Sequence, residues 1–278
     1  IYSDLRDSKP YLYFHFPNIN VKLENGFYDF TFITNSEGLR EVNDYNEIEK
    51  SVIYLGDSII EGASLENHET LDSHFENITG ITSLNFGLGS ANTIQEYHLL
   101  KDKYKSSYNT KLVVLGFCLN DLPHNKITKY FDPNVGNWKV YDFYEEPTIT
   151  GIVKSFIKKS KLILFVYNAI NQKNHEAAAN DRFSAKNYKK EAVDNTELYL
   201  NKISEFCKLI GSEFIVVIFP YESQLKNEKI LKNQAQDVLK TILKKNNIDY
   251  IDLYEPLHFQ YNNNKSIRWY HDDCHPYK

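Results

Sequence analysis

The chain has 278 residues and a formal net charge of −5, with 32 Lys and Arg against 37 Asp and Glu. Its 42% hydrophobic and 25% charged residues are typical of a globular protein, which excludes collagen-like, coiled-coil and wholly disordered chains. The mildly acidic balance argues against nucleic-acid binding, because that function needs a basic surface. The length accommodates one large domain with a sizeable core.

Antiparallel strands are expected first along the chain. Residues 11–34 alternate aromatic and polar side chains, which predicts short antiparallel strands with a turn at Asn25-Gly26. From residue 51 the pattern changes, and short apolar runs alternate with helical spacing. The predicted strands are 51–55, 83–86, 112–117, 214–219 and 248–253, and the predicted helices are 69–76, 93–104, 195–210 and 225–245. This alternation indicates an α/β fold with a mostly parallel sheet covered by helices on both faces.

The domain organisation follows from this change of pattern. We expect residues 1–50 to form a β-rich N-terminal extension packed on the core, and residues 51–278 to form the α/β domain. Residues 122–190 interrupt the alternation with an irregular, aromatic stretch that contains one apolar helical segment near 152–170. We interpret this stretch as an insertion beside the strand ends, where the sites of α/β proteins are built.

Methionine is absent from the sequence. A native start codon would supply one, so we expect that residue 1 is not the translational start and that a segment upstream was removed. The longest apolar runs, 162–167 and 214–220, are far shorter than the roughly 20 residues of a membrane-spanning helix. A membrane tether would therefore lie upstream of residue 1.

Four polar clusters stand where the chemistry of an α/β protein is expected. Gly56-Asp57-Ser58 follows the first predicted strand of the sheet, and Asn85-Phe86-Gly87-Leu88-Gly89-Ser90 follows the second. Cys118-Leu119-Asn120-Asp121 follows the third, and Asp272-Asp273-Cys274-His275 stands near the end of the chain. Each cluster alone is a weak signal, since serine in such a turn is usually a turn or cap residue. Their joint order is more informative.

In this order the four clusters resemble the signature motifs of the SGNH, or GDSL-type, hydrolases, over the chain from Ser51 to His275. The resemblance implies a three-layer α/β/α, flavodoxin-like fold. The segment Asn35-Ser36-Glu37-Gly38-Leu39-Arg40 also resembles one that precedes the Gly-Asp-Ser strand in envelope-associated members. It favours a bacterial cell-envelope, periplasmic or extracellular location and leaves a cytoplasmic one open.

The resemblance also implies roles for single residues. Ser58 is the expected nucleophile, and a serine hydroxyl needs a base to take its proton. His275 is the expected base, and Asp272 is expected to orient its ring. The oxyanion is expected to be held by the backbone N–H of Ser58, a backbone N–H of the second motif and the side-chain amide of Asn120.

The sequence departs from the family pattern at two places. The second motif usually has a glycine five residues after its asparagine, and here that position is Ser90, with Gly89 just before it. The backbone donor therefore stays open between Gly89 and Ser90. In the third motif Cys118 takes the place of a glycine, but Asn120 is present.

The same residues allow other interpretations. Ser64 and Ser90 are less favoured nucleophiles, because neither follows a strand-end turn. His271 and His275 are four residues apart, but Pro276 argues against a helical metal-binding pair. We expect no metal and no organic cofactor. The possible walls of the substrate site are aromatic: Trp269, Tyr270 and Trp138.

The sequence therefore predicts a serine-dependent acyl-ester hydrolase that removes O-acetyl groups from a glycan or polysaccharide. One alternative is an O-acetyltransferase that uses the same triad with a sugar hydroxyl as acceptor. Another is a non-catalytic glycan-binding or assembly module on the same scaffold, since fold does not determine function. The expected partner is a small-molecule or glycan ester, and the oligomeric state stays open.

Overall fold

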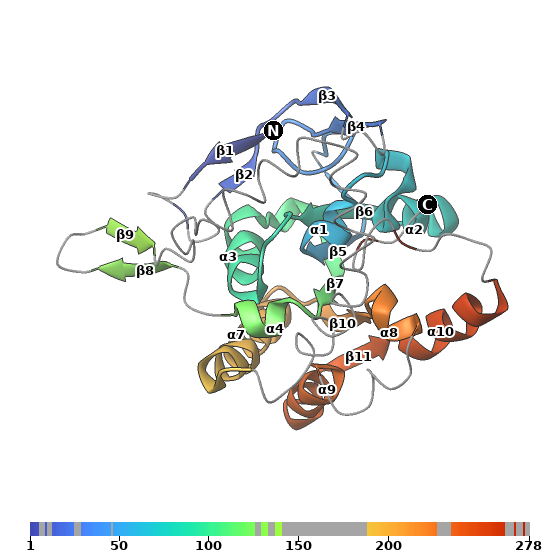
Figure 1. Ribbon diagram of the computed structural model, residues 1–278. Coiled ribbons are helices and arrows are strands. Elements are labelled where there is room, and N and C mark those ends of the chain that lie inside the picture. The colour runs from blue at the N-terminus through green and yellow to red at the C-terminus, as the bar shows by residue number, and fades with distance from the viewer. Residues whose placement is uncertain are drawn as a thin grey trace, which may run out of the picture.

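A five-stranded parallel sheet forms the centre of the protein (Figure 1). The computed structural model describes residues 1–5, 9, 13–24, 29–45, 47–125, 129–132, 137–140, 188–226, 235–264, 270 and 275. The strands of the sheet are β5 (Ser51–Gly56), β6 (Thr82–Gly87), β7 (Thr110–Cys118), β10 (Glu213–Phe219) and β11 (Asp249–Asp252). Each pair of neighbours is parallel, as the sequence predicts.

The strand order identifies the fold class. Across the sheet the order is β6-β5-β7-β10-β11, which is the 2-1-3-4-5 order of flavodoxin-like, doubly wound folds. The predicted α/β fold is therefore confirmed. The chain leaves β5 toward one edge of the sheet and returns to β7 on the other side, so the topological switch point lies between these two strands. Ligands of such folds bind at the carboxyl ends of the strands at this point.

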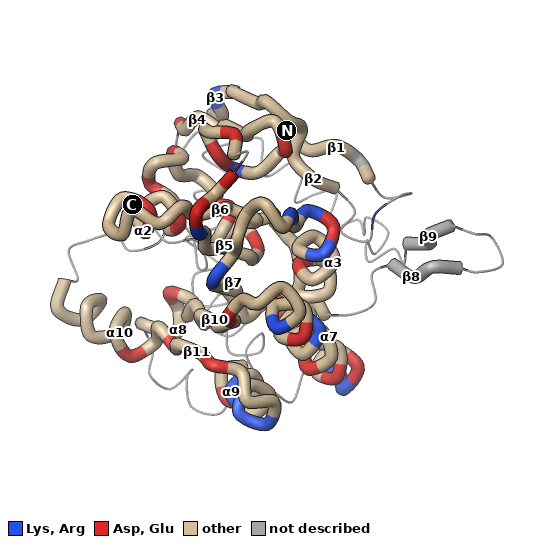
Figure 2. Tube along the Cα trace, turned by 180° about the vertical axis from the view of Figure 1, so that it is seen from behind, with Lys and Arg blue, Asp and Glu red and all other residues tan. Residues whose placement is uncertain are grey.

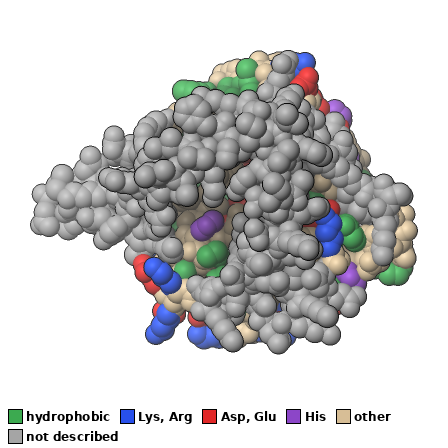
Figure 3. Space-filling view, viewed as in Figure 1, with side chains coloured by type: hydrophobic (Ala, Val, Ile, Leu, Met, Phe, Trp, Pro, Cys, Tyr) green, Lys and Arg blue, Asp and Glu red, His purple; other side chains and the backbone are tan. Residues whose placement is uncertain are grey.

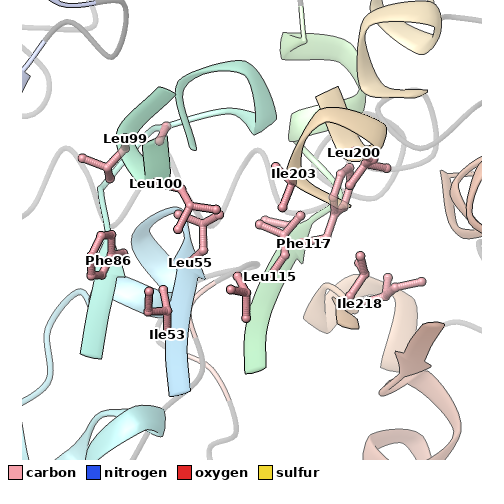
Figure 4. Close-up of a cluster of buried hydrophobic side chains, with 14 of the residues drawn as sticks. Ile53, Leu55, Phe86, Leu99, Leu100, Leu115, Phe117, Leu200, Ile203 and Ile218 are labelled. Carbon is pink, nitrogen blue, oxygen red and sulfur yellow. The ribbon is translucent and has the colours of Figure 1, made fainter. Parts of the chain in front are cut away.

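Side chains of the strands alternate between two apolar layers, because successive residues of a strand point to opposite faces. Ile53 and Leu55 of β5 belong to the main core, whereas Val52 and Tyr54 face a second, smaller cluster. The main core packs against α3 (Thr93–Lys103), α7 (Lys190–Leu209) and α9 (Ala235–Lys245). Figure 4 shows Leu55, Leu100 and Ile203 facing this core from β5, α3 and α7.

The second cluster is covered by the helices nearest to the strand ends. Ile60 of α1 (Ser58–Glu61) is buried in it, and Phe75 of α2 (Leu71–Thr79) packs against it. The remaining described helices are the 3₁₀ turns Asn67–Glu69 and Ser106–Tyr108, α4 (Asp121–His124), α8 (Glu222–Lys226) and α10 (Tyr254–Asn263). The sheet is thus layered between helices, as the three-layer prediction requires.

Most differences from the predicted elements are at their ends. The helix predicted from 195 begins at Lys190, because its buried stripe starts with the small Ala192 and the polar Thr196, which carry little apolar signal. The helix predicted over 225–245 is described as α8 and α9, and residues 227–234 between them lie outside the described part of the chain.

Two small antiparallel sheets precede the central one. β1 (Tyr2–Asp4) pairs with β2 (Tyr13–His15), and β3 (Asn20–Glu24) pairs with β4 (Asp29–Ile33). The predicted antiparallel strands are therefore present, while the predicted Asn25-Gly26 turn lies outside the described residues. Of the 122–190 stretch, the structure describes a hairpin of β8 (Lys129–Asp132) and β9 (Asn137–Val140), but not the segment 152–170.

The surface of the described helices carries charges of both signs. Acidic and basic residues are interspersed along α3, α7 and α9 (Figure 2). In the part of the chain that the structure describes, no helix is both long and apolar enough to cross a membrane. Cys118 and Cys207 are buried in the core as free thiols.

Candidate active site

Ser58 stands at the carboxyl edge of the sheet, on the sharp connection between β5 and α1. β5 ends at Gly56, Asp57 is the N-cap, and Ser58 is the first residue of α1. The Asp57 Oδ1 accepts a hydrogen bond of 2.9 Å from the backbone N–H of Ile59, which satisfies one of the free donors of the first helical turn. The short Gly-Asp-Ser segment therefore begins the helix and places Ser58 at the switch point.

Three glycines let α1 lie directly on the strand ends. Gly56 is the register neighbour of both Gly87 and Gly116, on the two adjacent strands. A Cβ atom at Gly87 would lie 2.1 Å from the backbone nitrogen of Glu61, and one at Gly116 would lie 2.4 Å from the Ile60 side chain. A larger residue at Gly87 would meet the backbone of α1 and require the helix to move, whereas one at Gly116 would require the Ile60 side chain to move. Gly56, Gly87 and Gly116 thus allow α1 to pack close to the strand ends, and this packing sets the position of Ser58 relative to the sheet.

His275 lies next to Ser58, as the family resemblance implies. Its Nε2 lies 2.8 Å from the Ser58 Oγ, within hydrogen-bonding distance. Asp272, the expected partner of the other ring nitrogen, lies outside the described residues. The structure thus brings Ser58 and His275 together and leaves the role of Asp272 as a prediction.

Tyr270 does not form a wall of the site, contrary to expectation. Its side chain is 4% exposed, and its hydroxyl donates a 2.9 Å hydrogen bond to the carbonyl of Pro220, directly after β10. The ring is held inside the protein because a buried tyrosine hydroxyl needs a partner, and the end of β10 provides one. Tyr270 therefore anchors the segment that carries His275. Trp269 and the Trp138 side chain lie outside the described residues.

The choice between Gly89 and Ser90 as backbone donor is decided by a hydrogen bond. The Gly89 N–H donates to the Glu61 Oε1 at 3.0 Å, so it is directed at a carboxylate and is not available to an oxyanion. The expectation for Gly89 is corrected on this ground. Ser90 is exposed, and its N–H meets no acceptor within the described residues. Its φ of 62° lies in the left-handed region that favours glycine, the usual residue of the motif.

Asn120 lies at the same edge of the sheet. It follows β7, the strand next to β5, and is the N-cap of α4. Its side chain is half-buried, and its Oδ1 is buried with no hydrogen-bond partner among the described residues. The third motif thus lies beside the first, as the resemblance implies.

A group of buried carboxyls, which the sequence did not reveal, lies behind the nucleophile. Burial raises the pKa of Asp57 to about 6, with the charge of His275 acting in the opposite direction. Burial, and then the charge of Asp57, raises the pKa of Glu96 well above its usual value. The pKa of Asp121 is raised by burial and by both neighbours. Glu96 lies in the helix α3, and its position in the helical pattern gives no sign that its carboxyl is buried near Asp57 and Asp121.

A cavity of about 570 Å³ opens beside Ser58 and His275. Its volume is in the usual range for small-molecule sites. Its lining combines apolar side chains with two further histidines and a glutamate; besides the pair itself, the lining residues are Ile59, Gly62, Ala63, Leu65, His68, Glu69, Leu71, His74 and Phe219. Histidine and hydrophobic side chains also lie next to each other on the face seen in Figure 3. No motif in the sequence indicates this wall, which comes from the segment after α1.

The rival assignments receive no support from the described residues. Ser64 lines a separate cavity of about 340 Å³ with Tyr2, Phe30 and Phe32, against the N-terminal extension. His275 Nε2 lies 2.8 Å from the hydroxyl of Ser58. Within the described ranges, no group of three His, Cys, Asp or Glu side chains could hold a metal ion, and His271 lies outside them.

Solved structures that the chain resembles are GDSL-type lipolytic proteins and esterases. An acetyl xylan esterase is 16% identical, with 82% of this chain and 91% of that chain covered and a TM-score of 0.45. A member of the lipolytic protein G-D-S-L family from Veillonella parvula is 12% identical, with coverages of 82% and 90% and a TM-score of 0.43. A GDSL-like lipase from Bacteroides thetaiotaomicron is 14% identical, with coverages of 82% and 80% and a TM-score of 0.41.

No protein-family model and no curated protein matches the sequence. The fold assignment stands on the strand order and on the three glycines that seat α1. The predicted three-layer, flavodoxin-like α/β fold is confirmed by the strand order.

Proposed function

We propose that this chain is a serine-dependent acyl-ester hydrolase of the SGNH type. The observation that carries the proposal is the 2.8 Å contact between Ser58 Oγ and His275 Nε2, at the switch point of the sheet and beside a cavity. A nucleophile and a base within hydrogen-bonding distance are the structural signature of covalent acyl transfer. The solved structures that the chain resembles include a GDSL-like lipase and an acetyl xylan esterase, whose names denote ester cleavage.

In the first half of the reaction, the Ser58 Oγ attacks the carbonyl carbon of the ester while its proton passes to His275 Nε2. The negative charge that develops on the carbonyl oxygen is held by the N–H groups of Ser58 and Ser90 and by the Asn120 amide. When the tetrahedral intermediate collapses, the carbon–oxygen bond to the alcohol breaks. The proton on His275 then goes to the leaving alcohol, and the acyl group stays on Ser58.

In the second half, water replaces the alcohol. His275 takes a proton from the attacking water, the acid is released, and the proton returns to Ser58. Asp272, by the family resemblance, would orient the His275 ring and stabilise its charged form. No step of this cycle calls for a metal or an organic cofactor.

For the substrate, we propose an O-acetyl ester of a glycan. The acetyl xylan esterase among the similar structures acts on such a compound. The cavity beside Ser58 supports an alcohol part with polar groups, because His68, Glu69 and His74 line it together with apolar side chains. Its apolar part, which includes Leu65, Leu71 and Phe219, would also suit a longer acyl chain. The length of the acyl chain that the enzyme accepts therefore discriminates between an acetyl esterase and an esterase for longer acyl groups.

The test compares p-nitrophenyl acetate, butyrate and decanoate with acetylated xylan, using Ser58→Ala as the blank and Ser64→Ala as a matched serine control. We expect turnover to fall with chain length, acetate to be released from the glycan, and the Ser64→Ala variant to behave as the wild type. Turnover of the decanoate without acetate release would overturn the glycan substrate. Acetate transfer to an added sugar in place of release would identify a transferase.

A further inference from the structure

Two hydrogen bonds hold Gly89, which precedes Ser90 in the second motif. Their partners are residues that belong to none of the sequence motifs. The Gly89 N–H donates to Glu61 Oε1 at 3.0 Å, and the Gly89 carbonyl accepts a hydrogen bond from the hydroxyl of Tyr13. Tyr13 belongs to β2 in the N-terminal extension, and Glu61 is the last residue of α1. This loop is therefore fixed by two contacts, one of which comes from outside the α/β domain.

Glu61 is itself held by the N-terminal extension. Its Oε1 accepts hydrogen bonds from the Tyr2 hydroxyl at 2.8 Å and from His15 Nε2 at 2.7 Å, and the other His15 nitrogen lies 3.0 Å from the Gly38 carbonyl. Both ring nitrogens of His15 thus face oxygen atoms, one on Glu61 and one on the Gly38 carbonyl. Burial opposes the ionisation of Glu61, but the contributions of His15, the Gly89 N–H and the Tyr2 hydroxyl together lower the pKa of Glu61.

The extension also grips the end of α1. Arg40 is 1% exposed, and its guanidinium donates hydrogen bonds of 2.6 Å to the carbonyls of Glu61 and Gly62 and a further one to the carbonyl of Leu65. Its guanidinium carbon lies 4.5 Å from the centre of the Phe32 ring. The nucleophile helix and the Gly89 loop are thus fastened to one scaffold, residues Tyr2 to Arg40.

The direction of the Ser90 N–H follows from the geometry of the peptide. Among the residues that the structure describes, every peptide bond is trans. In a trans peptide the carbonyl and the following N–H point in opposite directions. Because the Gly89 carbonyl points to Tyr13, the Ser90 N–H points away from Tyr13 and from the extension. Because a positive φ is unfavourable in a residue other than glycine, loss of the Tyr13 contact would favour rotation of this peptide away from its present orientation.

We propose that Tyr13 is a positioning residue for the reaction, because its hydroxyl fixes the Gly89–Ser90 peptide so that the Ser90 N–H stays directed at the oxyanion. The inference rests on the proposed function, since it assigns a purpose to the Ser90 N–H. It extends the machinery of the site to the N-terminal extension, through Tyr13 directly and through the Glu61–His15 pair that holds the Gly89 N–H. Tyr13 itself does not touch the substrate.

The test is Tyr13→Phe, which removes one hydroxyl and keeps the ring. The matched control is Tyr108→Phe. The Tyr108 hydroxyl also donates a hydrogen bond to the extension, at Glu37, but Tyr108 lies just before β7, at the amino ends of the strands and away from Ser58. We expect Tyr13→Phe to lower kcat for p-nitrophenyl acetate by about 10- to 100-fold with KM nearly unchanged, because a misplaced donor fails in the transition state. The control is expected to keep the wild-type kcat.

A second readout does not depend on catalysis. The Gly89 amide is expected to exchange with deuterium slowly in the wild type and in Tyr108→Phe, and roughly tenfold faster in Tyr13→Phe, because the loop opens more often. Equal exchange and equal kcat in all three proteins would overturn the proposal. A wild type that hydrolyses no ester would contradict the proposed function, and the exchange rates would then decide alone whether Tyr13 holds this peptide.

Discussion

Ser58 and His275 lie 217 residues apart in the sequence, yet Ser58 Oγ and His275 Nε2 are 2.8 Å apart in the structure. The anchor for this contact is the buried Tyr270, which ties the histidine segment to the end of β10. If the pair carries the reaction, His275→Ala lowers kcat for p-nitrophenyl acetate by at least about 10³-fold while the protein stays folded. His258→Ala, on α10, is the control and keeps the wild-type kcat. Residual activity within tenfold of the wild type would contradict the role of His275.

Asn120 provides a test of the oxyanion site. Replacing it with alanine removes one donor, and such a loss typically costs about 10²–10³ in kcat. Because the donor acts on charge that exists only in the transition state, we expect KM to change little. Initial rates over a range of p-nitrophenyl acetate concentrations separate the two constants. A raised KM with unchanged kcat would show that Asn120 binds the substrate and does not stabilise the transition state.

The close packing of α1 on the strand ends predicts that a side chain at Gly87 would clash with the backbone of α1. A Cβ there would lie 2.1 Å from the Glu61 nitrogen, which is a backbone atom that cannot move alone. We expect Gly87→Ala to lower the free energy of unfolding by about 3 kcal/mol, or to prevent folding. Gly80→Ala is the control, because a Cβ at Gly80 meets no atom within 4 Å and suffers only from its left-handed φ of 69°. Its cost should be about 1 kcal/mol. Urea unfolding measures both, and similar losses would contradict this account of the packing.

The buried Glu96 predicts an unusual dependence of stability on pH. Its pKa is raised in the folded protein by burial and by Asp57, so the folded state binds its proton more tightly than the unfolded state. Stability therefore falls as the pH rises from the unfolded pKa, near 4.5, toward the folded one. Glu96→Gln removes this loss, because the neutral amide has no charge to bury. We expect the variant to raise Tm more at pH 8 than at pH 5.

Thermal unfolding at the two pH values measures this effect. The exposed Glu205 on α7 provides the control substitution, Glu205→Gln, which should change Tm little at either pH. An equal effect of Glu96→Gln at pH 5 and pH 8 would show that Glu96 titrates alike in the folded and unfolded states.

Much of the fold could be predicted from the sequence because its strands are buried on both faces. Runs such as residues 112–117 and 214–219 are apolar without interruption, so both their type and their position are plain. Helix ends were predicted less well. The first turns of α7 depend on the small Ala192 and the polar Thr196, whose burial follows from contacts between distant elements.

The candidate site likewise contains some residues that the sequence predicts and some contacts that it does not. Ser58, Asn120 and His275 belong to short motifs whose order is visible in the chain, and the structure places the first two on neighbouring strand ends and the third against Ser58. The contacts that hold Glu61 could not be predicted, because Tyr2 and His15 meet it only when the extension folds over α1. Tyr270 was misjudged for a related reason: its ring turns inward to Pro220.

The central claim is that Ser58 is an activated nucleophile, and covalent labelling tests it most directly. A fluorophosphonate reacts with a serine only when a base removes the hydroxyl proton and the oxyanion is held. The account predicts that intact-protein mass spectrometry finds one phosphonyl group on the wild type, at Ser58, and none on Ser58→Ala or His275→Ala. A wild type that stays unlabelled, or a Ser58→Ala variant that is labelled as fast as the wild type, would contradict it.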